Sequence, residues 1–171
     1  MKEECLIWLD EITTESADKF LHILKEKVSA DCDHIHLAIQ SRGGSVPVAI
    51  GLANLILCLF CKVTTYNIGN VNSAAIILFA AGQERVCSAK ALFHMHPIST
   101  ELKGLQTHDS LLSAAREIEE DTKRVTEFLA NRSGITAPDS WMDFMMRSHT
   151  LYGEEAIQLG LVHRIGDYPF K

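Results

Sequence analysis

The chain has 171 residues, about the size of one domain, and 47% of them are hydrophobic, which is enough to build a core. A formal charge of −6 argues against nucleic-acid binding, because an acidic surface repels phosphates. The N-terminus shows no signal peptide, and the most apolar runs, residues 50–61 and 71–81, are too short to span a bilayer. We therefore expect one soluble, cytoplasmic domain over residues 1–171, with neither nucleic-acid nor membrane partners.

Strand and helix patterns alternate along the chain. Alternating or β-branched residues predict strands at residues 6–9, 34–39, 62–66, 85–87, 91–96 and 162–165. Apolar stripes at helical spacing predict helices at residues 14–28, 46–59, 73–81, 109–131, 139–146 and 154–159. Thr14 is the expected N-cap of the first helix, and Gly69 and Asn70 predict a loop. The alternation predicts an α/β protein with a parallel sheet, whose reactive groups gather at the carboxyl ends of the strands.

The cysteines number five and are scattered, which does not indicate a disulfide framework. Cys58 and Cys61 form a C-x-x-C pair that redox or zinc proteins also use. They lie in an apolar run without a second pair, so we interpret them as core cysteines.

Two features near predicted strand ends suggest catalysis. Ser73 is placed at the start of a helix and is followed by two alanines, so its hydroxyl is uncrowded beside free backbone N–H groups. Gly43 and Gly44 follow a strand and would let the backbone approach a ligand closely. A helix N-cap serine and a tight turn are the structural alternatives.

Two histidine pairs have the spacing that places side chains on one face of a strand. His94 or His96 could act as the base for Ser73. His34 and His36 lie beside Asp31 and Asp33, and we interpret that cluster as a partly exposed strand start and expect no metal site.

The motifs together resemble the Clp protease family. Residues 39–46 read I-Q-S-R-G-G-S-V, similar to the family's I-N-S-P-G-G, and residues 73–82 read S-A-A-I-I-L-F-A-A-G, similar to its S-M-G-A-x-L-L-x-A-G. Residues 90–97 resemble its histidine strand, and residues 151–162 its C-terminal F-L-S-A-x-E-A-x-E-Y-G-L-V-D. The resemblance covers residues 6–165, nearly the whole chain.

The resemblance implies a crotonase-like α/β fold of repeated ββα units with a protruding handle, at about residues 98–132. It implies a homo-oligomer of stacked heptameric rings that encloses peptide or unfolded protein substrates, and no cofactor. In the implied serine endopeptidase, Ser73 attacks the peptide carbonyl, His96 (alternatively His94) transfers the proton, and the N–H groups of Gly44 and Ala74 hold the oxyanion.

Three positions depart from the family pattern. The family's catalytic aspartate falls on Ser148, for which Asp143 is a possible substitute, and Arg42 replaces a proline. The segment before the first strand is short, which leaves docking to an ATPase unfoldase open. The alternatives are therefore a weak or inactive paralogue that partners an active subunit, and an acyl-CoA enzyme of the crotonase type.

Overall fold

The protein folds around one seven-stranded sheet in the residues that the computed structural model describes, 2–28 and 32–169. The elements in chain order are β1 (Lys2–Trp8), α1 (Thr14–Lys27), β2 (Cys32–Ser41), α2 (Val46–Leu57), β3 (Lys62–Asn72), α3 (Ala75–Ala80), β4 (Glu84–Cys87), β5 (Leu92–His94), α4 (His108–Arg132), α5 (Pro138–Met146), β6 (Thr150–Tyr152), α6 (Gly153–Gln158) and β7 (Arg164–Ile165). The main strand order is β1-β2-β3-β4-β7, and β5 and β6 branch from β3.

Strand β3 is shared between two parts of the sheet. Its first half, from Thr64 to Asn67, pairs with β4, and its last residues, from Asn70 to Asn72, pair with β5. Every pairing is parallel except β5 with β6. The end of β3 therefore lies beside β5, and Ser73 follows directly after this end.

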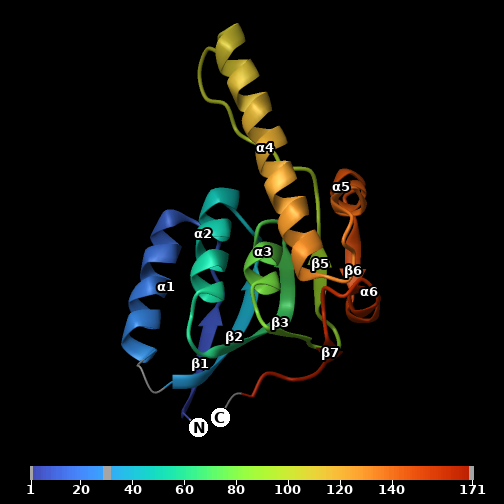
Figure 1. Cartoon of the computed structure of the whole chain (residues 1–171). Helices are drawn as coiled ribbons and strands as arrows, with labels where there is room; N and C mark the ends of the chain where they lie inside the picture. The colour runs from blue at the N-terminus through green and yellow to red at the C-terminus, as the bar shows by residue number, and fades with distance from the viewer. Residues whose placement is uncertain (1, 29–31, 170–171) are drawn as a thin grey trace.

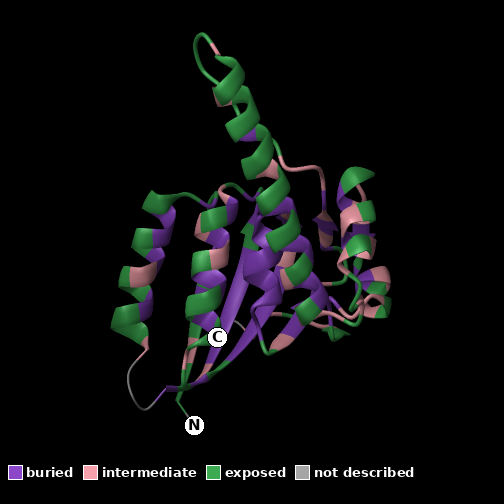
Figure 2. Ribbon diagram, turned by 45° about the horizontal axis from the view of Figure 1, so that its top comes forward, coloured by how far each residue is buried: buried purple, intermediate pink, exposed green. Residues whose placement is uncertain are grey.

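Helices α1, α2 and α3 lie side by side over one face of the sheet (Figure 1). Figure 2 shows the buried residues concentrated in the sheet and on the inner sides of these helices. Helix α3 lies at the centre of this packing, because all six of its residues are buried.

Helix α4 extends well beyond the rest of the protein (Figure 1). A capping box formed by Thr107 and Ser110 begins the helix. Its buried residues lie mostly in its second half, from Asp121 to Ala130, and its first half is largely exposed. We keep the name handle for residues 98–132, whose exposed first part projects from the rest of the protein.

The parallel α/β architecture predicted from the sequence is confirmed, and several local predictions are wrong. Gly69 and Asn70 lie inside β3 and not in a loop, because the strand continues to pair with β5. Thr13, not Thr14, caps α1 by accepting from Ser16 N. Cys58 is exposed, whereas Cys61 is buried, so only one of the pair is a core cysteine. Asp31 lies outside the described residues.

None of the helices in the described ranges combines the length and the apolar character that crossing a bilayer requires.

Candidate active site

Ser73 lies in the two-residue connection between β3 and α3. Its φ of 52° is in the left-handed region, which is costly for a residue other than glycine, and its N–H donates to His94 O at 2.8 Å. The helix begins at Ala75, so the prediction of a helix from residue 73 is wrong at its N-terminal end. A strained turn of this kind between a strand and a helix is also the position of the nucleophile in many hydrolases, where it exposes the hydroxyl group.

The glycine pair lies against this turn. Gly43 and Gly44 have φ values of 99° and 139°, which favour glycine. A Cβ atom on Gly43 would lie 2.7 Å from Ser73 Cβ, and one on Gly44 would collide with the carbonyl oxygen of Ile12. Glycine is therefore required at both positions, because the loop that contains them packs directly against the Ser73 turn and against Ile12.

Two backbone donors near Ser73 are available to a ligand. Among the described residues, the N–H groups of Gly44 and Ala74 have no hydrogen-bond acceptor within the protein. Gly43 O accepts from Ile12 N at 2.7 Å, and Ser45 N donates to Ile12 O at 2.8 Å, which fixes the orientation of the glycine loop. The donors predicted for the oxyanion therefore lie on two segments that are in contact.

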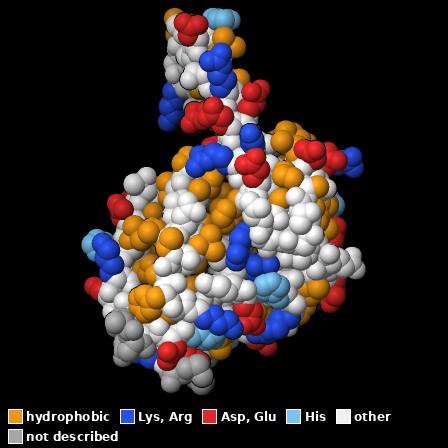
Figure 3. All heavy atoms as spheres, in the orientation of Figure 1, with side chains coloured by type: hydrophobic (Ala, Val, Ile, Leu, Met, Phe, Trp, Pro, Cys, Tyr) orange, Lys and Arg blue, Asp and Glu red, His pale blue; other side chains and the backbone are white. Residues whose placement is uncertain are grey.

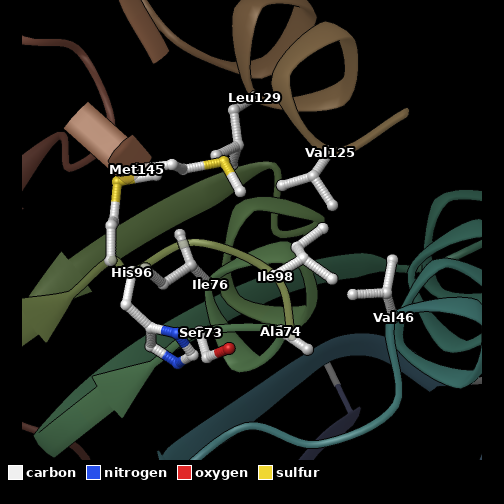
Figure 4. A pocket seen from close by; sticks show the side chains of 10 residues that line it. Val46, Ser73, Ala74, Ile76, His96, Ile98, Val125, Leu129 and Met145 are labelled. Atoms are coloured by element: carbon white, nitrogen blue, oxygen red, sulfur yellow. The ribbon is translucent and has the colours of Figure 1, made fainter. Parts of the chain in front are cut away.

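His96 lines the same two cavities as Ser73. Its ring lies beside the Ser73 side chain in Figure 4. His96 Nδ1 donates to the carbonyl oxygen of Pro97 at 2.8 Å, which leaves Nε2 without a proton in the neutral ring. This is the tautomer that a general base needs.

His94 has a different environment. Its Nδ1 is 2.9 Å from Thr150 Oγ1 on β6, and it lines neither cavity that contains Ser73. The structure thus brings His96, and not His94, into the cleft with the serine.

Neither candidate for the third catalytic residue hydrogen-bonds to His96 within the described residues. Ser148 has a φ of 51° in the turn after α5. Asp143 lines a separate cavity with Phe144 and His149. The partner of His96 is a backbone carbonyl, which side-chain patterns in a sequence cannot reveal.

Two cavities meet at Ser73. A narrow one of about 20 Å³ is lined mainly by apolar side chains, namely Val46, Ala74, Ile76, Met95, Ile98, Val125, Leu129 and Met145. A larger cleft of about 350 Å³ is lined by Arg42 and by Glu117 and the buried Asp121 of α4, among others. These two carboxylates could not be recognised from the sequence, because they lie on a helix that is charged along most of its length.

Two arginines, the buried Arg85 and the partly buried Arg132, bind backbone carbonyls at the C-terminal end of α3. Arg132 Nε donates to Ala80 O at 2.9 Å and Arg85 Nη1 to Gly82 O at 3.1 Å, so cations occupy the C-terminal end of the helix. Burial lowers the pKa of Arg85 to about 10, which still leaves it charged at neutral pH. The helix that follows Ser73 is therefore held at both ends.

A serine on a tight turn at the end of a parallel strand, a histidine in the same cleft and two free backbone donors define a serine hydrolase of the α/β class. The comparisons with known proteins give the family. The family model described as "Clp protease" matches residues 1–169, and the chain belongs to the Clp protease family. It is a serine endopeptidase of this family.

Relatives are similar over almost the whole chain. The chain is 30% identical over 156 residues to ATP-dependent Clp protease proteolytic subunit 3 of Rhizobium meliloti, covering 90% of this chain and 78% of that protein. It is 31% identical over 172 residues to proteolytic subunit 2 of Corynebacterium jeikeium, covering 97% and 80%. A ClpP1 point mutant from Listeria monocytogenes superposes with a TM-score of 0.85 at 22% identity, covering 96% of this chain and 92% of that chain. The expected ClpP-like fold is therefore confirmed.

Proposed function

We propose that Ser73 is the nucleophile and His96 the general base of this peptidase. Ser73 Oγ attacks the peptide carbonyl, His96 Nε2 accepts its proton, and the same histidine protonates the leaving amine. Water then attacks the acyl-enzyme by the same route, with the proton again moving through His96. The N–H groups of Gly44 and Ala74 stabilise the oxyanion in both steps.

One observation carries this assignment, namely the contact of the Gly43–Gly44 loop with the strained Ser73 turn. The contact brings a nucleophile and two unpaired donors to one point, and His96 borders the same cleft. Oxyanion donors act only when they are held in place before the reaction, and the two glycines provide that rigidity.

The apolar cavity supports a preference for substrates with an apolar side chain on the acyl side of the cleaved bond. Its volume of about 20 Å³ holds roughly one water, so it must widen to admit a side chain. Met95 and Met145 line it, and the flexible methionine side chain adapts to such changes.

We extend the proposal to a ring-shaped homo-oligomer, heptameric and stacked in pairs. The handle exposes Leu102, Leu105, Leu111 and Leu112, which suits a contact between rings. Figure 3 shows further hydrophobic side chains on the face where α1 and α2 lie, and these elements expose Ile23, Leu55 and Leu57. Unfolded chains delivered by an ATPase partner are the proposed substrates, since the curated relatives are named as ATP-dependent.

Hydrolysis of fluorogenic peptides by the purified oligomer tests the catalytic assignment. We expect peptides with leucine or methionine before the reporter group to be cleaved, and Ser73→Ala to abolish cleavage. A Ser113→Ala variant, which changes an exposed serine on α4, should retain activity. Equal activity of Ser73→Ala and the wild type would contradict the proposal.

A further inference from the structure

A second cluster of reactive side chains, Glu3, His34 and His36, lies on the neighbouring strands β1 and β2. Glu3 on β1 is paired in register with His34 on β2, and His36 follows two residues later on the same face. One ligand atom of each residue lies within 4.8 Å of those of the other two. The two imidazole rings are 4.0 Å apart between centroids.

His36 presents a buried nitrogen without a partner. Only 8% of the residue is exposed, and Nε2 makes no hydrogen bond among the described residues. The nearest carboxylate oxygen is Glu3 Oε2, at 3.7 Å, which is too long for a hydrogen bond. A buried polar atom without a partner has an energetic cost that a ligand at this point would remove.

The spacing suits a small cation. With zinc–nitrogen and zinc–oxygen bonds of about 2.0–2.2 Å, neighbouring ligand atoms of a tetrahedral site lie roughly 3.4 Å apart. The separation of 3.7 Å between His36 Nε2 and Glu3 Oε2 is close to this value. Glu3 is about half exposed, so its carboxylate is free to rotate by the small amount that closure requires.

Each histidine is also held by its other ring nitrogen. His34 Nε2 is 2.8 Å from Thr64 Oγ1, and His36 Nδ1 is 2.8 Å from the hydroxyl of Tyr66. Such bonds orient the ring and leave one nitrogen, His34 Nδ1 and His36 Nε2, for a metal. The nearby ammonium of Lys62 would repel a cation, but Glu84 binds it at 2.7 Å.

We infer that Glu3, His34 and His36 form a binding site for a divalent transition-metal ion of the zinc type, with water as the remaining ligand. Two neutral imidazoles and one carboxylate are a ligand set that zinc uses, and softer thiolate ligands are not needed.

The site would connect β1 to β2 and is separate from the peptidase cleft. Glu3 comes from the first strand and both histidines from the second, and the three residues line neither cavity that contains Ser73. A bound ion would therefore stabilise the N-terminal strand without taking part in peptide hydrolysis.

Titration of the tag-free, metal-stripped protein with Zn²⁺ in a calorimeter tests the inference. We expect one ion per chain, and a loss of affinity of at least tenfold in His34→Gln and in Glu3→Gln. The exposed His22 on α1 provides a matched control, and His22→Gln should bind as the wild type does. Tyr66→Phe keeps the packing but removes the hydroxyl that orients His36, and should weaken binding by roughly 10-fold.

Two further measurements separate this site from binding to surface histidines. Co²⁺ should give the visible absorption of a four- or five-coordinate ion in the wild type and not in His34→Gln. Zn²⁺ should slow amide hydrogen exchange in β1. The absence of Zn²⁺ binding to the wild type, or equal binding by wild type, His34→Gln and Glu3→Gln, would overturn the inference.

Discussion

His96 is oriented by the backbone of the next residue, because its Nδ1 donates to the carbonyl oxygen of Pro97 at 2.8 Å. In serine proteases an aspartate performs two tasks here: it selects the tautomer and it stabilises the imidazolium that forms. A neutral carbonyl performs the first task and only weakly the second. We therefore expect Ser73, His96 and the Pro97 carbonyl to work together, with a slower acylation step than an aspartate in place of the carbonyl would give.

Restoring a carboxylate should raise the activity. Ser148 has a left-handed φ of 51°, which aspartate tolerates better than most residues, and the next residue's carbonyl accepts from Met95 N, adjacent to His96. We predict that Ser148→Asp increases kcat at least tenfold, measured with a fluorogenic peptide. Asp143→Asn should leave kcat within about twofold, because Asp143 lines another cavity. Loss of activity in Asp143→Asn with no gain in Ser148→Asp would show that Asp143, and not position 148, supplies the catalytic carboxylate.

The glycine loop should be important for catalysis, because it lies against the Ser73 turn. A methyl group on Gly43 would lie 2.7 Å from Ser73 Cβ and 3.0 Å from Ala74 N, so Gly43→Ala must displace the nucleophile or an oxyanion donor. We expect kcat/KM to fall by about 10²–10³, the usual effect of losing one donor. Gly51 on α2 has no atom within 4 Å of an added Cβ, so Gly51→Ala is a matched control that should keep full activity.

The free energy of unfolding should depend on Glu84 in a pH-dependent way. Hydrogen bonds from Lys62 and Arg164 lower the pKa of Glu84 to about 2, from an ordinary value of 4.5. Because the folded pKa is depressed, the stabilisation is complete above pH 4.5 and is lost as the pH falls toward 2. All three side chains are partly exposed, so we expect Glu84→Gln to cost only about 1 kcal/mol at pH 7.

Urea unfolding of Glu84→Gln and the wild type at a series of pH values measures this effect. The difference between them should shrink steadily below pH 4.5. Glu101→Gln, in an exposed loop, should show no such trend. A difference that stays constant with pH would rule out the ion pairs as its cause.

The leucines of the handle should control assembly. Leu105 is fully exposed and Leu111 is half exposed in the single chain, although both are large and apolar. We predict that Leu105→Asp together with Leu111→Asp halves the mass of the assembly seen by light scattering. The same assembly in the variant and the wild type would show that the handle does not join rings.

Periodicity and glycine positions predicted most of the fold, and the reasons for the failures are specific. The three-residue strand β6 has too few residues for a pattern and exists because it pairs with β5. Gly69 and Asn70 indicated a loop, but the neighbouring strand keeps them extended in β3. Both errors arise where long-range pairing outweighs local preference.

The site divides in the same way. Local chemistry singled out Ser73 and the glycine pair as candidates, and the resemblance to the Clp protease motifs favoured them over an N-cap serine and a tight turn. The partner of His96 could not be predicted, since every residue carries a carbonyl. The pair His34 and His36 was noted in the sequence without expecting a metal site, because its pairing with Glu3 could not be seen: β1 and β2 are joined by a long helical connection.

Active-site labelling with a fluorophosphonate, followed by peptide mapping, tests the central claim most directly. The reagent reacts with a serine that a histidine activates, so we predict an adduct on Ser73 in the wild type and in His94→Ala. His96→Ala should be labelled at least a hundredfold more slowly, with its folding checked by circular dichroism. A folded wild-type protein without an adduct on Ser73, or labelling that depends on His94 and not on His96, would contradict the account.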